Sequence, residues 1–203
     1  MKHGFDPDDH DDVDIYKLLI GLVVPRPIGW IGSVSSEGVR NLAPFSFFNA
    51  VAASPPTVLF STIRAGGARK DTLSNVEETG VFTVNVVTEE TVEAMNVTSG
   101  GYEPSVDEFE VAGLTAVAGT VVDAPMVGEA KANLECRLSQ VVPIGTDGPM
   151  AASIVIGEVV RIHVEGSILD GTRIDQAALR AVGRMGGPTY TRTRDLFSLD
   201  RPE

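Results

Sequence analysis

The sequence predicts a mainly β fold, an antiparallel barrel with helices inserted between its strands. About seven segments carry the alternation or the β-branched and aromatic composition typical of strands, and short turns separate most of them. The two strongest neighbours, residues 27–34 and 39–49, are joined by the four-residue turn 35–38, which is typical of a hairpin. No GxGxxG motif follows a strand, which disfavours a doubly wound parallel sheet.

Length and composition indicate one ordinary globular domain. The 203 residues are 43% hydrophobic and 22% charged, and a chain of this size can bury a sizeable core. Residues 1–12 are rich in aspartate and are predicted to form a disordered acidic tail. Residues 13–203 are predicted to form the domain itself.

The net charge of −12 limits the possible partners. It comes from 28 acidic against 16 basic residues, so the surface repels nucleic acid and anionic membranes. No apolar run approaches the roughly 20 residues needed to span a bilayer. The acidic N-terminus is unlike a signal peptide, and we expect a cytoplasmic protein.

Few residues in the sequence suggest a disulfide or a metal site. The single cysteine, Cys136, excludes an internal disulfide and lies in an apolar–polar alternation, so we expect a buried structural thiol. His3 and His10 lie among aspartates without a fixed ligand spacing, so no metal site is expected there.

The first part of the chain is predicted to contain one helix and three strands. Asp14 provides an N-cap acceptor for the helix, and Gly21 ends it. Gly38 is available for the positive φ angle of the hairpin turn. The third strand has no polar residue before Ser61, which favours a central position. The predicted elements are a helix at 14–21, strands at 27–34, 39–49 and 57–63, and a loop at 51–56.

The remainder is predicted to alternate between helices and strands. Gly80 ends one helix and Thr88 caps the next. Leu134, Cys136 and Leu138 share one face of a clearly alternating strand. The predicted elements are helices at 71–78, 88–97 and 174–182, strands at 81–87, 114–122, 133–144 and 153–165, a break at 125–128, turns at 146–149 and 169–171, and loops at 98–104 and 183–190.

A basic loop is the best candidate for an anion site. Residues 64–70 carry Arg64, Arg69 and Lys70 together with two glycines, and they lead directly into a predicted helix. Free N–H groups and the dipole at a helix start favour an anion, and Thr72 adds a hydroxyl, so a phosphate monoester fits this loop. A solvated surface loop is the alternative. Ser61 and Thr62 end the preceding strand and point toward the same region, unless they are merely solvated there.

A second candidate site lies where the hairpin ends. Ser46 and Asn49 offer hydrogen-bonding groups to a heterocycle edge, and Phe47 and Phe48 offer apolar faces. The alternative is that the aromatics belong to the core and the polar groups satisfy a turn. Trp30 is expected in the core or an interface rather than as a stacking platform.

Three further residues could reach a ligand. His163 shares a strand face with Arg161, an unusual neighbour for a core face, and would suit proton donation or contact with an anion near neutral pH. A plain surface or interface histidine is the alternative. Arg184 and Tyr190 flank a Gly-Gly pair and could close over a ligand, or pack on a partner subunit.

Together these segments resemble the flavin reductase-like family, FMN-binding split-barrel proteins that include flavoredoxin. The resemblance extends from about Val24 to Tyr190, with the segments in the family's order and Met185 where the family has leucine. The segments are RPIGWIGSVSSEGVRNLAPFSFFN at 26–49, KDTLSN at 70–75, FTVNV at 82–86, IGEVVRIHV at 156–164 and RMGGPTY at 184–190.

The resemblance implies a split β-barrel that forms a homodimer and binds FMN non-covalently near the subunit interface. It places Ser33 and Ser35 near the isoalloxazine, and Ser46, Phe47, Phe48 and Asn49 along the ring and ribityl chain. It places Ser61, Thr62, Ile63, Arg64, Lys70, Asp71 and Thr72 around the phosphate, and His163 near the reacting rings.

The implied activity is hydride transfer from NAD(P)H to the flavin, with the cofactor performing the difficult step. A monooxygenase or a small electron-poor molecule would accept the electrons, and the stretch from Thr98 to Phe109 would shape access. Two alternatives are an electron-transfer flavoprotein without its own NAD(P)H reductase activity and a non-enzymatic barrel that binds a small ligand.

Overall fold

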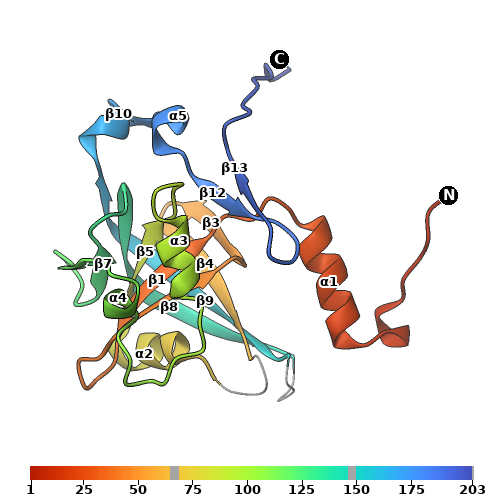
Figure 1. The fold of residues 1–203 in the computed structure, drawn as a ribbon, viewed down its shortest axis with the longest axis horizontal. Helices are drawn as coiled ribbons and strands as arrows, with labels where there is room; N and C mark the ends of the chain where they lie inside the picture. Colours follow the sequence, from red (N-terminus) through yellow and green to blue (C-terminus); the bar gives the residue numbers. More distant parts are fainter. Residues whose placement is uncertain (65–68, 146–149, 203) are drawn as a thin grey trace.

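A seven-stranded antiparallel sheet dominates the computed structural model, which describes residues 1–64, 69–145 and 150–202 (Figure 1). The strand order is β2-β1-β5-β8-β9-β4-β3, and every pairing in it is antiparallel. The prediction of a mainly β, antiparallel fold is confirmed. The strands are β1 (Gly29–Val34), β2 (Arg40–Phe45), β3 (Phe48–Ala53), β4 (Pro56–Ile63), β5 (Val81–Val86), β8 (Ala132–Ile144) and β9 (Ala152–Val164).

The two ends of the sheet approach each other across the core. Phe45 belongs to β2 at one edge and Phe60 to β4 near the other edge, yet their ring centroids lie 5.0 Å apart. Gly29 of β1 also meets Phe48 of β3, where an added Cβ would lie 2.6 Å from the ring. Only a strongly curved sheet brings these strands together, and the enclosed space is filled by apolar side chains such as Phe82.

A second core forms on the other side of β1. Trp30 is completely buried there, and its indole N–H donates to Thr98 Oγ1 over 2.9 Å. Met95, Phe109 and Val127 pack in the same cluster. The expected core position of Trp30 is confirmed.

Five helices accompany the described part of the sheet. They are α1 (Asp12–Leu22), α2 (Asp71–Thr79), α3 (Val92–Val97), α4 (Glu108–Val111) and α5 (Gln176–Leu179). α1 stands away from the sheet and has no buried residue, whereas α2 packs its buried face against β1 (Figure 1). None of the helices in the described ranges is long and apolar enough to cross a membrane.

Three predicted loops or breaks are strands in the structure. The predicted loop 51–56 is largely β3, whose alanines give little alternation, and the predicted break 125–128 is β7 (Pro125–Val127). β7 pairs with β6 (Ala116–Ala118), which is shorter than the strand predicted at 114–122. The predicted loop 183–190 contains β12 (Val182–Arg184), which pairs with β13 (Tyr190–Arg192).

Several helix boundaries also differ from the predictions. Asp11 caps α1, and Thr91 precedes α3 in place of the predicted Thr88. The last predicted helix, 174–182, is shortened to α5 because Arg180 adopts a left-handed φ of 57°. Its first residue, Ile174, instead belongs to β11 (Arg173–Ile174). β11 pairs with β10 (Leu169–Asp170), which follows the short 3-10 helix Gly166–Ile168. The predicted turn 146–149 and most of the basic loop 64–70 lie outside the described residues.

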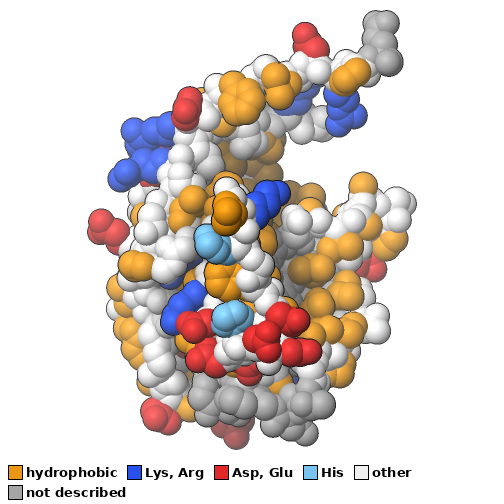
Figure 2. Space-filling model, turned by 90° about the vertical axis from the view of Figure 1, so that its right-hand side faces the viewer, with side chains coloured by type: hydrophobic (Ala, Val, Ile, Leu, Met, Phe, Trp, Pro, Cys, Tyr) orange, Lys and Arg blue, Asp and Glu red, His pale blue; other side chains and the backbone are white. Residues whose placement is uncertain are grey.

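The N-terminus and the cysteine follow their predictions in part. Residues 1–14 are all exposed, but they include a short 3-10 helix at Pro7–Asp9, and the predicted disorder stays a prediction. Figure 2 shows acidic and hydrophobic side chains side by side on this face of the molecule. Cys136 is buried as expected, and burial raises the pKa of its thiol to about 12.

Candidate functional site

A large pocket lies between α1 and the sheet. Its volume is about 760 Å³, and it is walled by α1, by the connection between β2 and β3, and by β4 and β9. Most of its lining is apolar, with a few hydroxyl and amide groups. Six residues predicted from the sequence line it: Ser46, Phe47, Phe48, Asn49, Ser61 and Ile63.

Two smaller cavities connect this pocket with the start of α2. A cavity of about 400 Å³ shares Ser46 and Ser61 with the large pocket and is also lined by Lys70. Lys70 in turn lines a cavity of about 120 Å³ together with Asp71 and Thr72. The structure therefore brings both sequence-predicted groups, the hairpin end and the basic helix start, into one region.

The start of α2 is suited to an anion. Lys70 is the N-cap, and the first bonded amides of the helix are those of Leu73 and Ser74, which donate to the Lys70 carbonyl. The preceding amides belong to the first turn, where N–H groups lack helical acceptors. Lys70 is exposed, and no carboxylate in the described ranges lies within ion-pair distance of it. The residues present thus offer a positive charge and free donors.

A buried polar network supports this helix from behind. Asn41 Oδ1 accepts hydrogen bonds from Thr72 at 2.7 Å and from Ser33 at 3.2 Å. Asn41 Nδ2 donates to Glu108 at 2.9 Å, and the Leu42 amide donates to the same carboxyl group. Burial raises the pKa of Glu108 above its usual value, against these hydrogen bonds.

Four predicted site residues hold supporting positions in this chain. Ser33, Thr62 and Thr72 are buried, with 0%, 3% and 1% exposure, so their side chains lie in the protein interior behind the residues that line the large pocket. Thr62 alternates with Ser61 and Ile63 along β4, and successive strand residues point to opposite faces. Ser35 caps the hairpin turn by accepting the Val39 amide, away from the start of α2.

Arg64 is the first residue after β4 and lies at the edge of the described region. It follows Ile63 directly, and its amide donates to the Ala151 carbonyl. Its predicted phosphate contact stays a prediction, because the loop that would join it to Lys70 is not described.

His163 lies at the opposite end of the sheet from the pocket. Ile154, which pairs with the pocket residue Ser61, is nine residues before it, roughly 30 Å along an extended strand. Its Nε2 lies 2.6 Å from Oε1 of the fully buried Glu135. The structure does not bring His163 together with the pocket within one chain, and its catalytic assignment stays a prediction.

Glu135 anchors a loop at that end. Thr120 Oγ1 and the amides of Val121 and Val122 donate to its carboxylate over 2.6–2.8 Å. Burial alone would raise the pKa of Glu135, but the hydrogen bonds from Thr120, His163 and these amides outweigh burial and lower it far below the usual range.

The sequence reasoning missed Arg26 as a pocket residue. Its guanidinium lines the large pocket and lies 5.9 Å from the centre of the Phe47 ring. Its Nε donates to Ser46 Oγ over 3.3 Å. The sequence offered two signals: Arg26 opens the segment 26–49 that resembles the family, and the flanking Pro25 and Pro27 restrict the backbone that carries its side chain.

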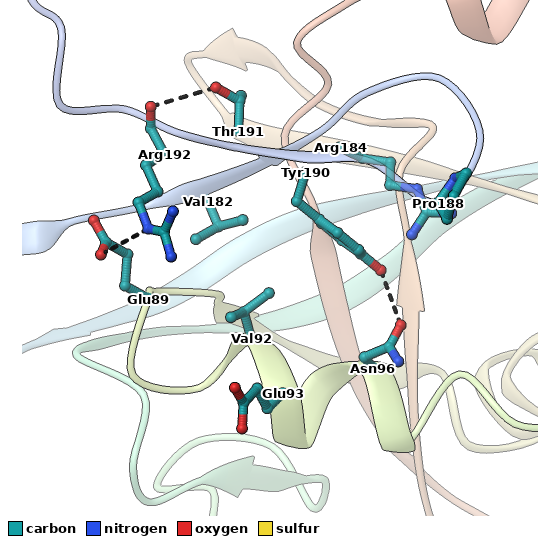
Figure 3. A pocket seen from close by; sticks show the side chains of 10 residues that line it. All are labelled: Glu89, Val92, Glu93, Asn96, Val182, Arg184, Pro188, Tyr190, Thr191 and Arg192. Atoms are coloured by element: carbon teal, nitrogen blue, oxygen red, sulfur yellow. Dashed lines mark hydrogen bonds and ion pairs between the residues drawn. The ribbon is translucent and has the colours of Figure 1, made fainter.

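A separate pocket of about 500 Å³ lies between α3 and the β12–β13 hairpin (Figure 3). Tyr190 crosses it and donates to Asn96 Oδ1 over 3.1 Å, while the guanidinium of Arg184 lies over the Tyr190 ring at 4.5 Å. On the other side Arg192 bonds Glu89. Arg184, Tyr190 and Asn96 also line a cavity of about 250 Å³ that reaches Arg26 and Ser46.

These features define a class of protein, a mainly β protein with an apolar pocket near a helix start that is suited to an anion. The family model for the flavin reductase like domain matches residues 21–177. The chain belongs to this family, and the resemblance found in the sequence is confirmed.

Relatives and solved structures agree with this assignment. A protein of Halalkalibacterium halodurans is 44% identical, covering 97% of this chain and 95% of its own length. Component B of nitrilotriacetate monooxygenase from Bacillus cereus is 38% identical with a TM-score of 0.94, covering 98% and 99% of the two chains.

Two further structures extend the comparison. The 2-nitrobenzoate 2-nitroreductase of Pseudomonas fluorescens is 30% identical with a TM-score of 0.89, covering 98% of this chain and 96% of its own. A Shewanella frigidimarina protein with a split barrel domain, 24% identical with a TM-score of 0.84, covers 99% of this chain and 100% of its own and shares the fold.

Proposed function

We propose that this protein is an oxidoreductase that binds FMN non-covalently in the large pocket and accepts hydride from NAD(P)H. Membership of the flavin reductase like family supports flavin as the cofactor. The pocket volume of about 760 Å³ lies within the range of about 300–1,000 Å³ usual for cofactor sites. Its apolar walls and few polar groups suit a flat ring with polar edges.

The observation that carries the proposal is that the hairpin end and Lys70 line connected cavities. Phe47 and Phe48 would face the ring, with Ser46 and Asn49 at its polar edge and along the ribityl chain. Ser61, Ile63 and Arg64 would flank the chain toward the phosphate. Lys70 and the first amides of α2, beside Asp71, would hold the phosphate itself.

The chemistry of hydride acceptance is supplied by the bound flavin. The protein's residues bind and orient it, and the apolar walls exclude water from the reacting face. On β9, His163 lies nine residues beyond Ile154, the partner of the pocket residue Ser61. A catalytic role for His163 would therefore require this end of a second subunit to reach the pocket.

Dimer formation is part of the proposal. α1 and its C-cap expose apolar side chains although α1 walls the pocket: Val13, Leu19, Leu22 and the C-cap Val23 are 52%, 51%, 77% and 58% exposed. A homodimer that covers α1 would enclose the flavin further, and size-exclusion chromatography with light scattering tests this.

Two electron acceptors fit the comparisons. The similarity to a monooxygenase component favours a monooxygenase partner that uses reduced flavin. The similarity to a nitroreductase favours direct reduction of a small electron-poor molecule. An electron-transfer protein without its own NAD(P)H reductase activity is the remaining alternative.

Spectroscopy and a turnover assay test the proposal together. We expect the protein titrated with FMN to show the absorbance of bound oxidised flavin, and to oxidise NADH or NADPH when FMN is present. Absence of flavin binding would refute the proposal. Binding without NAD(P)H oxidation would leave the electron-transfer alternative. Oxidation that requires an added nitroaromatic would identify a direct reductase.

A further inference from the structure

Arg26 is a buried cation at the wall of the proposed flavin pocket. The residue is 5% exposed, yet it lines both the large pocket and the adjoining 250 Å³ cavity. Arginine is almost never this buried unless it is paired. Its position therefore calls for a specific explanation.

The guanidinium ties three chain segments together through neutral acceptors. Nη1 donates to the carbonyls of Ile20 and Val23 at 2.6 and 2.7 Å, which fastens the end of α1. Nη2 donates to the Met185 carbonyl at 2.9 Å, and Nε donates to Ser46. These bonds engage four of the five N–H groups of the guanidinium, but they bring no negative charge.

The described part of the chain places no negative charge against the guanidinium. In residues 1–64, 69–145 and 150–202, no carboxylate lies within ion-pair distance of Arg26. Burial and the neighbouring Arg184 lower the pKa of Arg26 below its usual value, and Tyr16 opposes this. The field of such a charge acts strongly on a neighbouring ligand, because little water screens it.

Flavin reduction creates a matching negative charge. A hydride carries two electrons and one proton from the nicotinamide to the neutral oxidised ring. The nicotinamide leaves as the oxidised cation, and the reduced ring gains one negative charge. A nearby buried cation therefore stabilises the reduced ring more than the oxidised one.

We propose that Arg26 raises the reduction potential of the flavin bound beside it, through its buried and uncompensated charge. This inference rests on the proposed function. Arg26 also positions the pocket, because it links α1, Ser46 and the segment after β12. A purely structural role would depend on the shape of the guanidinium, whereas an electrostatic role depends on its charge.

The midpoint potential of bound FMN separates these roles. Arg26→Gln removes the charge, and Arg26→Lys keeps it but loses the planar fork of donors. We expect Arg26→Gln to bind reduced FMN at least tenfold less tightly relative to oxidised FMN, which lowers the potential by about 30 mV or more. We expect Arg26→Lys to change this ratio less than twofold. Arg161→Gln removes the same charge from an exposed site on β9 and is expected to change nothing.

A second variant protects the test against misfolding. Arg26→Met also removes the charge, with a flexible side chain that fills irregular space; we expect it to lower the potential as Arg26→Gln does. An unchanged potential in both Arg26→Gln and Arg26→Met, or equal shifts in Arg26→Gln and Arg26→Lys, would overturn the inference while flavin binding stood. If the wild-type protein takes up no FMN, the proposed function fails, and the inference fails with it.

Discussion

Arg26 and Glu89 are both buried charges beside a pocket, but the protein treats them differently. The Glu89 side chain is 8% exposed and is surrounded by Arg180, Arg192 and Arg194. The hydrogen bonds from Arg194, with the one from Arg180, outweigh burial and lower the pKa of Glu89 to about 2. Arg26 has neutral partners only, in the part of the chain that the structure describes.

The difference separates structural charges from ligand-facing charges. The arginines around Glu89 are the C-cap of α5, a residue of β13 and a residue that follows β13, so this cluster fastens the C-terminal segment to the loop before α3 (Figure 3). Glu135 likewise holds the loop 120–122. Arg26 leaves positive charge at the large pocket and Lys70 leaves it at the adjoining 400 Å³ cavity, where the proposed anionic cofactor would meet both. Mutation of Glu89 or Glu135 should therefore lower the stability of the protein, whereas mutation of Lys70 or Arg26 should change how the flavin is bound.

Lys70→Ala should have the largest effect, on ligand affinity. A hydrogen bond to a charged group contributes about 1.5–3 kcal/mol, so FMN should bind roughly 10- to 150-fold less tightly. Riboflavin, which lacks the phosphate, should bind as before, and the melting temperature should hardly change. Fluorescence titration measures both affinities. Lys2→Ala in the exposed tail is the matched control, and equal loss for both flavins would remove Lys70 from the phosphate site.

Glu135→Gln should affect stability instead of binding. Replacing the buried carboxylate weakens its hydrogen bonds, and we expect the free energy of unfolding to fall by about 1.5–3 kcal/mol. The folded-state pKa of Glu135 lies below its ordinary value of 4.5, so its contribution is full above about pH 4.5 and is lost as the pH falls further. Denaturant unfolding at several pH values measures this.

The exposed Glu158→Gln variant on β9 is the control for Glu135→Gln. A stability difference between wild type and Glu135→Gln that persists unchanged at the lowest pH would contradict the assignment of the effect to the carboxylate.

Glu89→Gln should give the smaller effect, confined to the C-terminal segment. Its melting temperature should be lower than that of the wild type at pH 7, and the gap should close as the pH falls from 4.5 toward 2, where Glu89 of the wild type becomes protonated. FMN affinity should remain within about twofold of wild type. A large loss of FMN affinity would show that the two clusters are not independent.

The sheet could be predicted from the sequence wherever side chains alternate strongly. β1, β5, β8 and β9 have clear patterns of large apolar residues, and all four were predicted close to their observed bounds. β3 was missed, because Ala50, Ala52 and Ala53 give almost no contrast between its faces. The β12–β13 hairpin was missed, because its Gly-Gly-Pro turn conceals two three-residue strands.

The site could be predicted in outline, but not the direction of each side chain. Ser46–Asn49, Ser61 and Lys70 line connected cavities as expected. Thr62 and Ser33 point into the interior, because the strand period of two places them on the other face. The curvature of the sheet decides which of its faces lines the pocket. This curvature depends on contacts between residues far apart in the sequence, such as Phe45 and Phe60. The burial of Arg26 depends on the same distant contacts.

Calorimetric titration of the wild-type protein with FMN and with riboflavin tests the central claim most directly. If the pocket holds the ring and the start of α2 holds the phosphate, FMN binds at one site per chain and at least tenfold more tightly than riboflavin. Equal affinity for the two flavins, or no binding of either, would contradict the account.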